Sequence, residues 1–124
     1  MFNRILNCLL PKPTFKTLSQ GEYGGMESPG YLLITKQEDL PEGLIETTPN
    51  FNKNHLVLLS LGIKSTGGYL IEATNVYRNG CTLNIQYITK GPQKGEMVTD
   101  ALSTAYHLIS IPKFKKIKIQ DETR

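Results

Sequence analysis

The sequence predicts a single mainly-β domain, an antiparallel β-sandwich or a partly open barrel of six to eight strands with at most one or two short helices. Residues 81–87 alternate apolar and polar side chains, which is typical of a strand with one wet face. Asn79-Gly80 stands between two such runs and predicts a type I′ hairpin turn, which needs positive φ at both positions. Short continuous apolar runs, which are typical of buried strands, occupy 31–35, 56–63 and 105–111.

Length and composition place the chain among ordinary globular proteins. It has 124 residues, 39% of them hydrophobic and 20% charged, which is too apolar for a disordered chain. The net charge of +3 does not indicate a nucleic-acid binder. No run approaches the roughly 20 apolar residues of a membrane-spanning helix. We therefore expect one domain with its own core and no transmembrane segment.

The domain is expected over residues 14–120, between an N-terminal lead segment at 1–13 and a polar tail at 121–124. The lead segment, loose or the remnant of a leader, holds Cys8 in a context faintly like a lipoprotein cleavage site. Its apolar run is shorter than the roughly 7–15 residues of a signal peptide. The protein is thus cytoplasmic on the sequence as given, or exported or envelope-attached if a leader was lost. Whether Cys8 is lipidated or free stays open.

The first half of the domain is expected to start with a strand at 14–19 and a loop or bulged edge at 20–30. The apolar run at 31–35 predicts a strand buried on both faces. Acidic residues in 37–44 favour a short helical turn, which Pro41 and Gly43 keep short. A polar connection follows at 49–54, anchored by Phe51.

Residues 56–88 predict a meander of three successive strands, with a glycine-rich turn at 64–68 and the hairpin turn at Asn79-Gly80. Cys81 begins the third strand and is expected to be a small buried hydrophobe. Residues 96–104 fit a short helix and a strand equally well. After the strand at 105–111, the lysine-rich stretch 113–118 predicts an edge strand guarded by charge.

Part of this pattern resembles a known family. Leu61-Gly62, Ser65-Thr-Gly-Gly-Tyr69 and Ala105-Tyr-His-Leu-Ile-Ser-Ile-Pro112 look like the C-terminal domain of PrcB, a bacterial subunit associated with a protease complex. The resemblance covers residues 51–113, although the family's proline before Tyr-His is Ala105 here. It implies a β-rich, non-catalytic domain that stabilises or assembles with a protease.

The candidate partner-binding residues are Thr66, Gly67, Gly68, Tyr69, Tyr106 and His107. Paired glycines let a partner backbone approach closely, and Tyr69 could anchor it. The alternative is that Gly67 and Gly68 only form the turn while Tyr69 enters the core. His107 could likewise be a structural histidine with both ring nitrogens hydrogen-bonded, rather than part of a groove beside the turn.

No catalytic, metal or cofactor site is predicted. The two histidines, His55 and His107, lack metal-ligand spacing. The serines at 60, 103 and 110 have no nucleophile motif, and Glu72 is expected to be solvated. Lys113, Lys115, Lys116 and Lys118 fit a solvated edge or a contact with an acidic partner or a membrane surface.

The sequence therefore favours a non-enzymatic protein-binding module whose partner is another protein, a protease if the resemblance holds. The alternative function is a small protease inhibitor that presents the 65–69 loop to an active site, a role that a viral origin would favour. Exposed edge strands leave room for a homodimer without predicting one.

Overall fold

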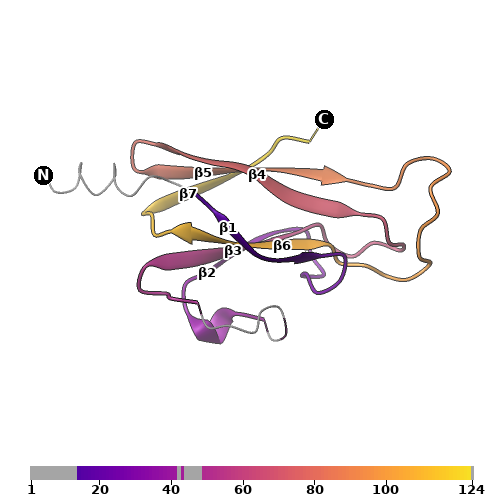
Figure 1. Cartoon of the computed structure of the whole chain (residues 1–124), viewed down its shortest axis with the longest axis horizontal. Helices are drawn as coiled ribbons and strands as arrows, with labels where there is room; N and C mark the ends of the chain where they lie inside the picture. The colour runs from indigo at the N-terminus through magenta and orange to yellow at the C-terminus, as the bar shows by residue number, and fades with distance from the viewer. Residues whose placement is uncertain (1–13, 42, 44–48, 124) are drawn as a thin grey trace, which may run out of the picture.

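The protein is a sandwich of two β-sheets. The computed structural model describes residues 14–41, 43 and 49–123. In this part of the chain, a four-stranded sheet ordered β1-β6-β3-β2 faces a three-stranded sheet ordered β4-β5-β7 (Figure 1). The predicted sandwich is confirmed, since these two sheets do not close into a barrel. The strands are β1 (Lys16–Gly21), β2 (Gly30–Ile34), β3 (Asn54–Ser60), β4 (Leu70–Asn79), β5 (Thr82–Lys90), β6 (Tyr106–Pro112) and β7 (Lys116–Asp121).

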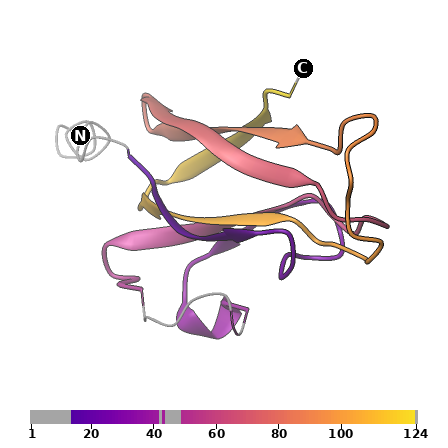
Figure 2. The ribbon, with the colours of Figure 1, turned by 45° about the vertical axis from the view of Figure 1, so that its right-hand side comes forward.

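The main core lies between the two sheets, which Figure 2 shows as separate layers. Alternate residues of the facing strands fill it, as the period of two requires. Leu83 and Ile85 of β5 and Ile109 of β6 are fully buried there. The whole set of buried residues is Val57, Leu59, Ile71, Ala73, Val76, Leu83, Ile85, Ala105, Ile109 and Ile111.

A second cluster covers the outer face of the four-stranded sheet. It contains the buried residues Ile34, Leu56, Leu58, Tyr106 and Leu108. Leu40, which directly follows the 3-10 turn η1 (Gln37–Asp39), and Phe51 pack on this cluster. The short helical turn and the aromatic anchor were both predicted. Strands β3 and β6 are therefore buried on both faces, which explains their continuous apolar sequences.

The hairpin between β4 and β5 is correct in place but differs in turn type. Asn79 pairs with Thr82, so Gly80 and Cys81 form the two-residue loop. Gly80 has φ +66°, and no non-glycine residue among those described has positive φ. A type I′ turn centred on Asn79-Gly80 is therefore wrong. The geometry fits a type II′ turn, which places glycine at its first central position.

Strand β4 contains a bulge that explains an irregular hydrophobic pattern. The register against β5 shifts between Ala73 and Asn75. One extra residue moves the following side chains to the opposite face. Ile71, Ala73 and Val76 consequently all point into the main core, although Val76 breaks the simple alternation.

The predicted three-strand meander is wrong, because β3 and β4 lie in different sheets. Both edges of β3 are already paired, one with β2 and the other with β6. The glycine-rich turn therefore carries the chain from one sheet to the other. The sheets are also not wholly antiparallel, since β7 pairs with β5 in parallel.

The predictions for two of the edge strands have different outcomes. The lysine-guarded edge strand is confirmed as β7, in which Ile117 and Ile119 pack on the core. The strand at 31–35 is found as β2, but it is not buried on both faces. It lies at the edge of its sheet, and only Ile34 of its five residues is buried.

The remaining predictions concern Cys81, the segment 96–104, and residues that lie outside the described part of the chain. Cys81 is exposed and disulfide-bonded, so the prediction of a small buried hydrophobe is wrong. Residues 96–104, for which helix and strand were equally open, form neither; Ser103 makes an isolated bridge to Lys64. The lead segment 1–13 with Cys8, and Arg124 of the tail, lie outside the described residues.

Core packing predicts that replacing either of two isoleucines by alanine has very different effects on the free energy of unfolding. Ile85→Ala removes a fully buried side chain and should lower the free energy of unfolding by about 2–5 kcal/mol. Ile63 is 50% exposed, so Ile63→Ala should change it by less than about 1 kcal/mol. Urea denaturation of both variants measures this. Equal losses would contradict the assignment of the core.

Candidate protein-contact surface

Three connections meet at one end of the sandwich, at the right of Figure 1. They are residues 22–29 between β1 and β2, 61–69 between β3 and β4, and 91–105 between β5 and β6. The predicted turn Thr66–Tyr69 belongs to the second of these loops. Loops held at one end of a rigid sandwich are a common place for binding residues.

The glycine-rich turn packs against the 91–105 loop instead of protruding from it. The Gly67 amide donates to the Thr99 carbonyl at 3.0 Å. The Ser103 hydroxyl donates to the Thr66 carbonyl at 2.6 Å. Lys64 and Ser103 exchange two backbone hydrogen bonds, at 2.8 and 2.9 Å. These bonds fix the turn in one conformation.

Glu22 joins all three loops. Its side-chain carboxylate accepts a hydrogen bond from the Gly68 amide. Its backbone carbonyl accepts from the Thr104 amide at 2.9 Å. A carboxylate that accepts from a backbone amide makes a charge-assisted hydrogen bond, stronger than a neutral one. The loop end is therefore a rigid platform.

Both glycines of the turn are needed for close approach. A Cβ atom at Gly67 would collide with the Thr99 hydroxyl. At Gly68, which has φ +89°, a Cβ would lie 2.6 Å from Val98 Cγ1 and 2.9 Å from Pro92 Cγ. The alternative reading, in which this pair serves the fold, accounts for these contacts. The partner that approaches the glycines is the protein's own 91–105 loop.

The aromatic candidates are mostly internal. Tyr69 is partly buried against the main core, with Lys64 Nζ 5.6 Å from its ring centroid. Tyr106 is only 6% exposed and bonds through its hydroxyl to Ser19 Oγ. Of the six predicted contact residues, the structure thus brings Thr66–Tyr69 to the loop end and places Tyr106 beneath the 19–25 segment.

His107 lies between the sheets and bridges three strands. It is 2% exposed. Its Nδ1 accepts from the Ala73 amide of β4 at 2.9 Å, and its Nε2 lies 2.8 Å from Thr17 Oγ1 of β1. Since Nδ1 is an acceptor, the neutral ring carries its proton on Nε2 and donates it to Thr17. The structural role considered for His107 thus accounts for both ring nitrogens.

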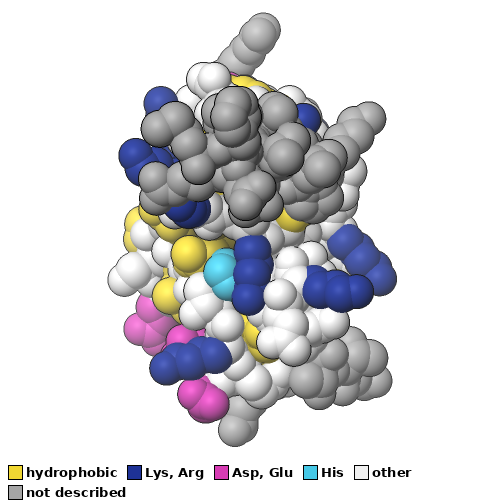
Figure 3. Space-filling view, turned by 90° about the vertical axis from the view of Figure 1, so that its left-hand side faces the viewer, with side chains coloured by type: hydrophobic (Ala, Val, Ile, Leu, Met, Phe, Trp, Pro, Cys, Tyr) yellow, Lys and Arg dark blue, Asp and Glu magenta, His cyan; other side chains and the backbone are white. Residues whose placement is uncertain are grey.

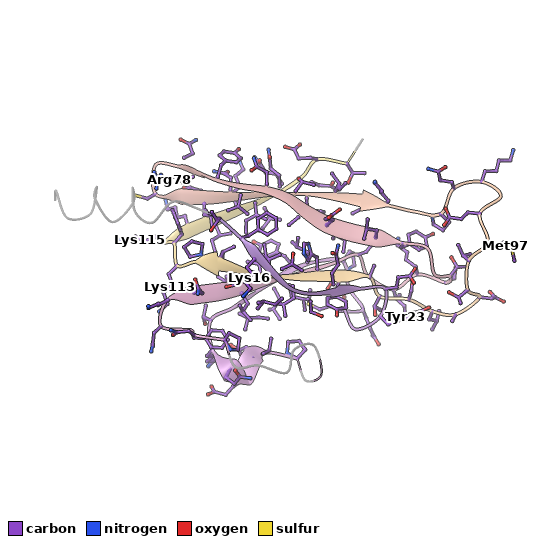
Figure 4. The ribbon with its side chains drawn as sticks, viewed as in Figure 1. Lys16, Tyr23, Arg78, Met97, Lys113 and Lys115 are labelled. Carbon is purple, nitrogen blue, oxygen red and sulfur yellow. The ribbon has the colours of Figure 1, made fainter. Side chains whose placement is uncertain are left out.

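Four apolar side chains are exposed on the three loops, and we call them the loop-end surface. Met97 is 97% exposed and Leu102 63%, both on the 91–105 loop. Tyr23 and Ile63, on the other two loops, are each 50% exposed. Figure 4 shows Met97 and Tyr23 at this end. Exposed apolar residues gathered on a rigid platform are characteristic of protein-binding surfaces.

The loop-end surface could not be predicted from the sequence, because single apolar residues in polar loops carry no periodic signal. Leu102 is placed by the antiparallel bridge between Ser103 and Lys64, which joins the 91–105 loop to the 61–69 loop. Tyr23 is placed by a 3.3 Å contact between its hydroxyl and Thr99 Oγ1. The available signal was Met97, an apolar residue in a loop bounded by Gly and Pro.

The opposite end of the sandwich carries several basic side chains. Figure 3 shows Lys and Arg side chains spread over that face, one of them beside a histidine, with Asp and Glu side chains at the lower left, and Figure 4 places Lys16, Lys113 and Lys115 toward that end. The pKa of His55 is lowered by partial burial and by the positive charge of Lys113. The two ends thus differ in their exposed side chains: the loop-end surface adds apolar ones, and the opposite end has several lysines.

The reactive polar side chains of the described residues do not form a cluster. No three His, Cys, Asp or Glu side chains there lie close enough to hold a metal ion. Ser60 accepts from the Met26 amide, and Ser103 donates to Thr66, so both hydroxyls have structural partners. The described part of the chain also holds no helix long and apolar enough to cross a membrane.

The family model described as PrcB C-terminal matches residues 56–112. This range contains β3 from Leu56 onward and the whole of β4, β5 and β6, with the glycine-rich turn and the 91–105 loop. Strands β1, β2 and β7, which lie outside it, are all sheet edges. No curated protein and no solved structure matches the chain.

The packing of the turn predicts that Gly→Ala substitutions at two positions of similar φ lower the free energy of unfolding by unequal amounts. Gly68→Ala adds a clash with Val98 and Pro92 to backbone strain, and should lower the free energy of unfolding by about 1–3 kcal/mol more than the control. The control is Gly95→Ala, at φ +84° with nothing within 4 Å of the new Cβ. Urea denaturation measures both. Similar losses would contradict the packed turn.

His107 predicts a loss of stability in mild acid. Burial lowers its pKa in the folded state below the ordinary 6.5, although Glu72 raises it somewhat. As pH falls, the unfolded chain therefore binds the proton before the folded protein does. The stability that neutral His107 contributes is fully present above pH 6.5 and is lost as pH falls toward the folded-state pKa. Protonation of Nδ1 would also turn the Ala73 bond into a donor–donor contact.

The measurement is the free energy of unfolding from about pH 7.5 to 5 for three proteins, spanning the ordinary His pKa. His107→Asn keeps an acceptor near Nδ1 but does not titrate, so its profile should be flatter than that of the unmodified protein. His55→Gln, which removes the partly exposed histidine, should leave most of the slope. If only His55→Gln flattened the profile, His107 would not be the sensor.

Proposed function

We propose, on the premise that residues 56–112 make this chain a member of the PrcB C-terminal family, that it is a non-catalytic module that assembles with a protease. The loop-end surface is the contact site in this proposal. The family resemblance supports a protease as the partner. The observation that supports binding is the exposure of Met97 and Leu102 on a loop held by backbone hydrogen bonds.

The energetics favour a contact at the loop-end surface. Burying a Met or Leu side chain against a partner contributes about 1.5–3 kcal/mol each. Because Glu22, Thr99 and Ser103 already fix the loops, little conformational entropy is lost on binding. Met97 is nearly free of intramolecular contact and can adapt to an irregular partner surface.

The alternative of a protease inhibitor that inserts the 65–69 loop is less well supported. An inhibitory loop of this kind must enter an active-site cleft, and therefore has to protrude. Gly67 is buried beneath Thr99, and the Thr66 carbonyl is occupied by Ser103. Only Ser65 of residues 65–69 is exposed.

The test replaces two exposed side chains of the loop-end surface. A double variant, Met97→Lys with Leu102→Lys, should fold normally and lose at least about tenfold in affinity for the protease recovered with the unmodified chain from its native host. Tyr77→Lys is the matched control, since Tyr77 is also exposed and apolar but lies on β4. Calorimetry with the purified protease gives the affinities.

Two outcomes would reject the proposal. No protease is recovered from the host, and deletion of the gene leaves proteolysis unchanged; or the double variant binds as well as the Tyr77→Lys control. Competitive inhibition of the isolated protease by the unmodified chain would instead favour the inhibitor.

A further inference from the structure

Strand β2 leaves one side of the four-stranded sheet open. It pairs with β3 from Gly30↔Ser60 to Ile34↔Leu56 without a register shift. On its other side, no strand of the described residues pairs with it. A flat edge of this kind presents backbone N–H and C=O groups that can pair with another extended chain.

The other three sheet edges are each blunted by a recognisable device. Strand β1 shifts register between Thr17 and Ser19. On β4, Gln20 Nε2 donates to the Ile71 carbonyl at 3.1 Å, and the Ala73 amide donates to His107, so these backbone groups are occupied. Strand β7 alternates exposed lysines with partly buried isoleucines that pack on the core. Bulges, covering groups and edge lysines all discourage pairing with another chain.

Strand β2 carries none of these devices. Its five residues, Gly-Tyr-Leu-Leu-Ile, include no charge, proline or bulge. Tyr31 is 52% exposed, Leu33 39% and Leu32 37%. An uncharged apolar edge strand is an exception in a protein whose other edges are protected, and it is suited to pairing with another extended chain.

The unequal size of the sheets explains why these side chains are exposed. Tyr31 pairs with Leu59 and Leu33 with Val57, and both β3 residues belong to the core between the sheets. Tyr31 and Leu33 therefore point to the inner face of their sheet. The opposite sheet has only three strands and leaves them uncovered. A strand added beside β2 would pack its own inner-face side chains against them.

We propose that β2 pairs antiparallel with β2 of a second copy of this chain, about a twofold axis at Leu32. The strand is self-complementary in this register. Leu32 lies opposite its own counterpart, and Tyr31 lies opposite Leu33 of the second copy on the inner face. Each contact occurs twice, as an isologous interface requires. Aromatic–aliphatic pairs across strands are favourable, and no like charges meet.

This pairing joins two four-stranded sheets into one continuous sheet. The loop-end surfaces would then point in opposite directions, because Gly30 follows the 22–29 loop and the second strand runs the other way. A dimer would therefore present two contact surfaces at its two ends. This inference goes beyond the proposed function, and β2 lies outside the residues matched by the family model.

The dimer should be weak, because one five-residue strand pair is smaller than a standard interface. Sedimentation equilibrium of the full chain, from low micromolar to near-millimolar concentration, should show a reversible monomer–dimer equilibrium. Leu32→Lys sets two like charges opposite each other and should weaken the dimer by about tenfold or more. Tyr77→Lys replaces an equally exposed side chain, 37%, on the guarded strand β4 and should leave it unchanged.

Hydrogen exchange on the unmodified chain provides a second measurement that does not depend on a variant. Alternate amides of β2 should become protected as concentration rises, and nuclear Overhauser contacts in a mixture of labelled and unlabelled chains should join Tyr31 to Leu33 of the other copy. A monomer at every concentration overturns the inference. So does a dimer that leaves the β2 amides unprotected, or one that Tyr77→Lys weakens as much as Leu32→Lys.

Discussion

The histidine bridge between the sheets is the interaction on which the arrangement of this protein depends. His107 extends from the centre of one sheet, accepts from Ala73 in the other, and donates to Thr17 on the neighbouring edge strand. Removing the ring would leave the Ala73 amide without its partner, and a buried unpaired group costs about 1–3 kcal/mol. The bridge fixes how β4 lies over β6 and closes the main core on that side. Together with Gln20, it also occupies backbone groups of β4 that would otherwise be open to another chain.

The loop end follows from the same arrangement. Because β3 and β4 belong to different sheets, the chain must turn sharply between them and pass under the 91–105 loop. Only glycine fits at 67 and 68, and Glu22 and Ser103 then satisfy the polar groups of the turn. The backbone hydrogen bonds are used internally, and the apolar side chains left exposed at this end are Tyr23, Ile63, Met97 and Leu102. The glycine-rich turn therefore supports the loop-end surface from beneath.

Local sequence patterns predicted the positions of the strands well, but they predicted poorly which strands pair with one another. The alternation at 81–87 and the apolar runs at 56–63 and 105–111 correspond to β5, β3 and β6. A strand buried on one face alternates apolar and polar residues, and a strand buried on both faces has a continuous apolar sequence. The run at 31–35 has the same composition as a central strand, but it pairs only with β3 and therefore lies at an edge, with most of its side chains exposed. The hairpin was located correctly, yet its type depends on which of Asn79 and Gly80 pairs with β5, and sequence spacing does not decide that.

By itself, the sequence determined the class of fold, the place of the glycine-rich turn and the resemblance of residues 56–112 to the PrcB C-terminal family, because side-chain period and turn composition are local properties. The tertiary structure alone decided which strands pair, which histidine is buried and which apolar residues stay exposed. Those features depend on contacts between residues far apart in the chain, such as Ala73 with His107 and Gly68 with Glu22. No periodicity records such contacts. That is why the glycine-rich turn could be recognised from the sequence, while the surface it supports could only be found in the folded protein.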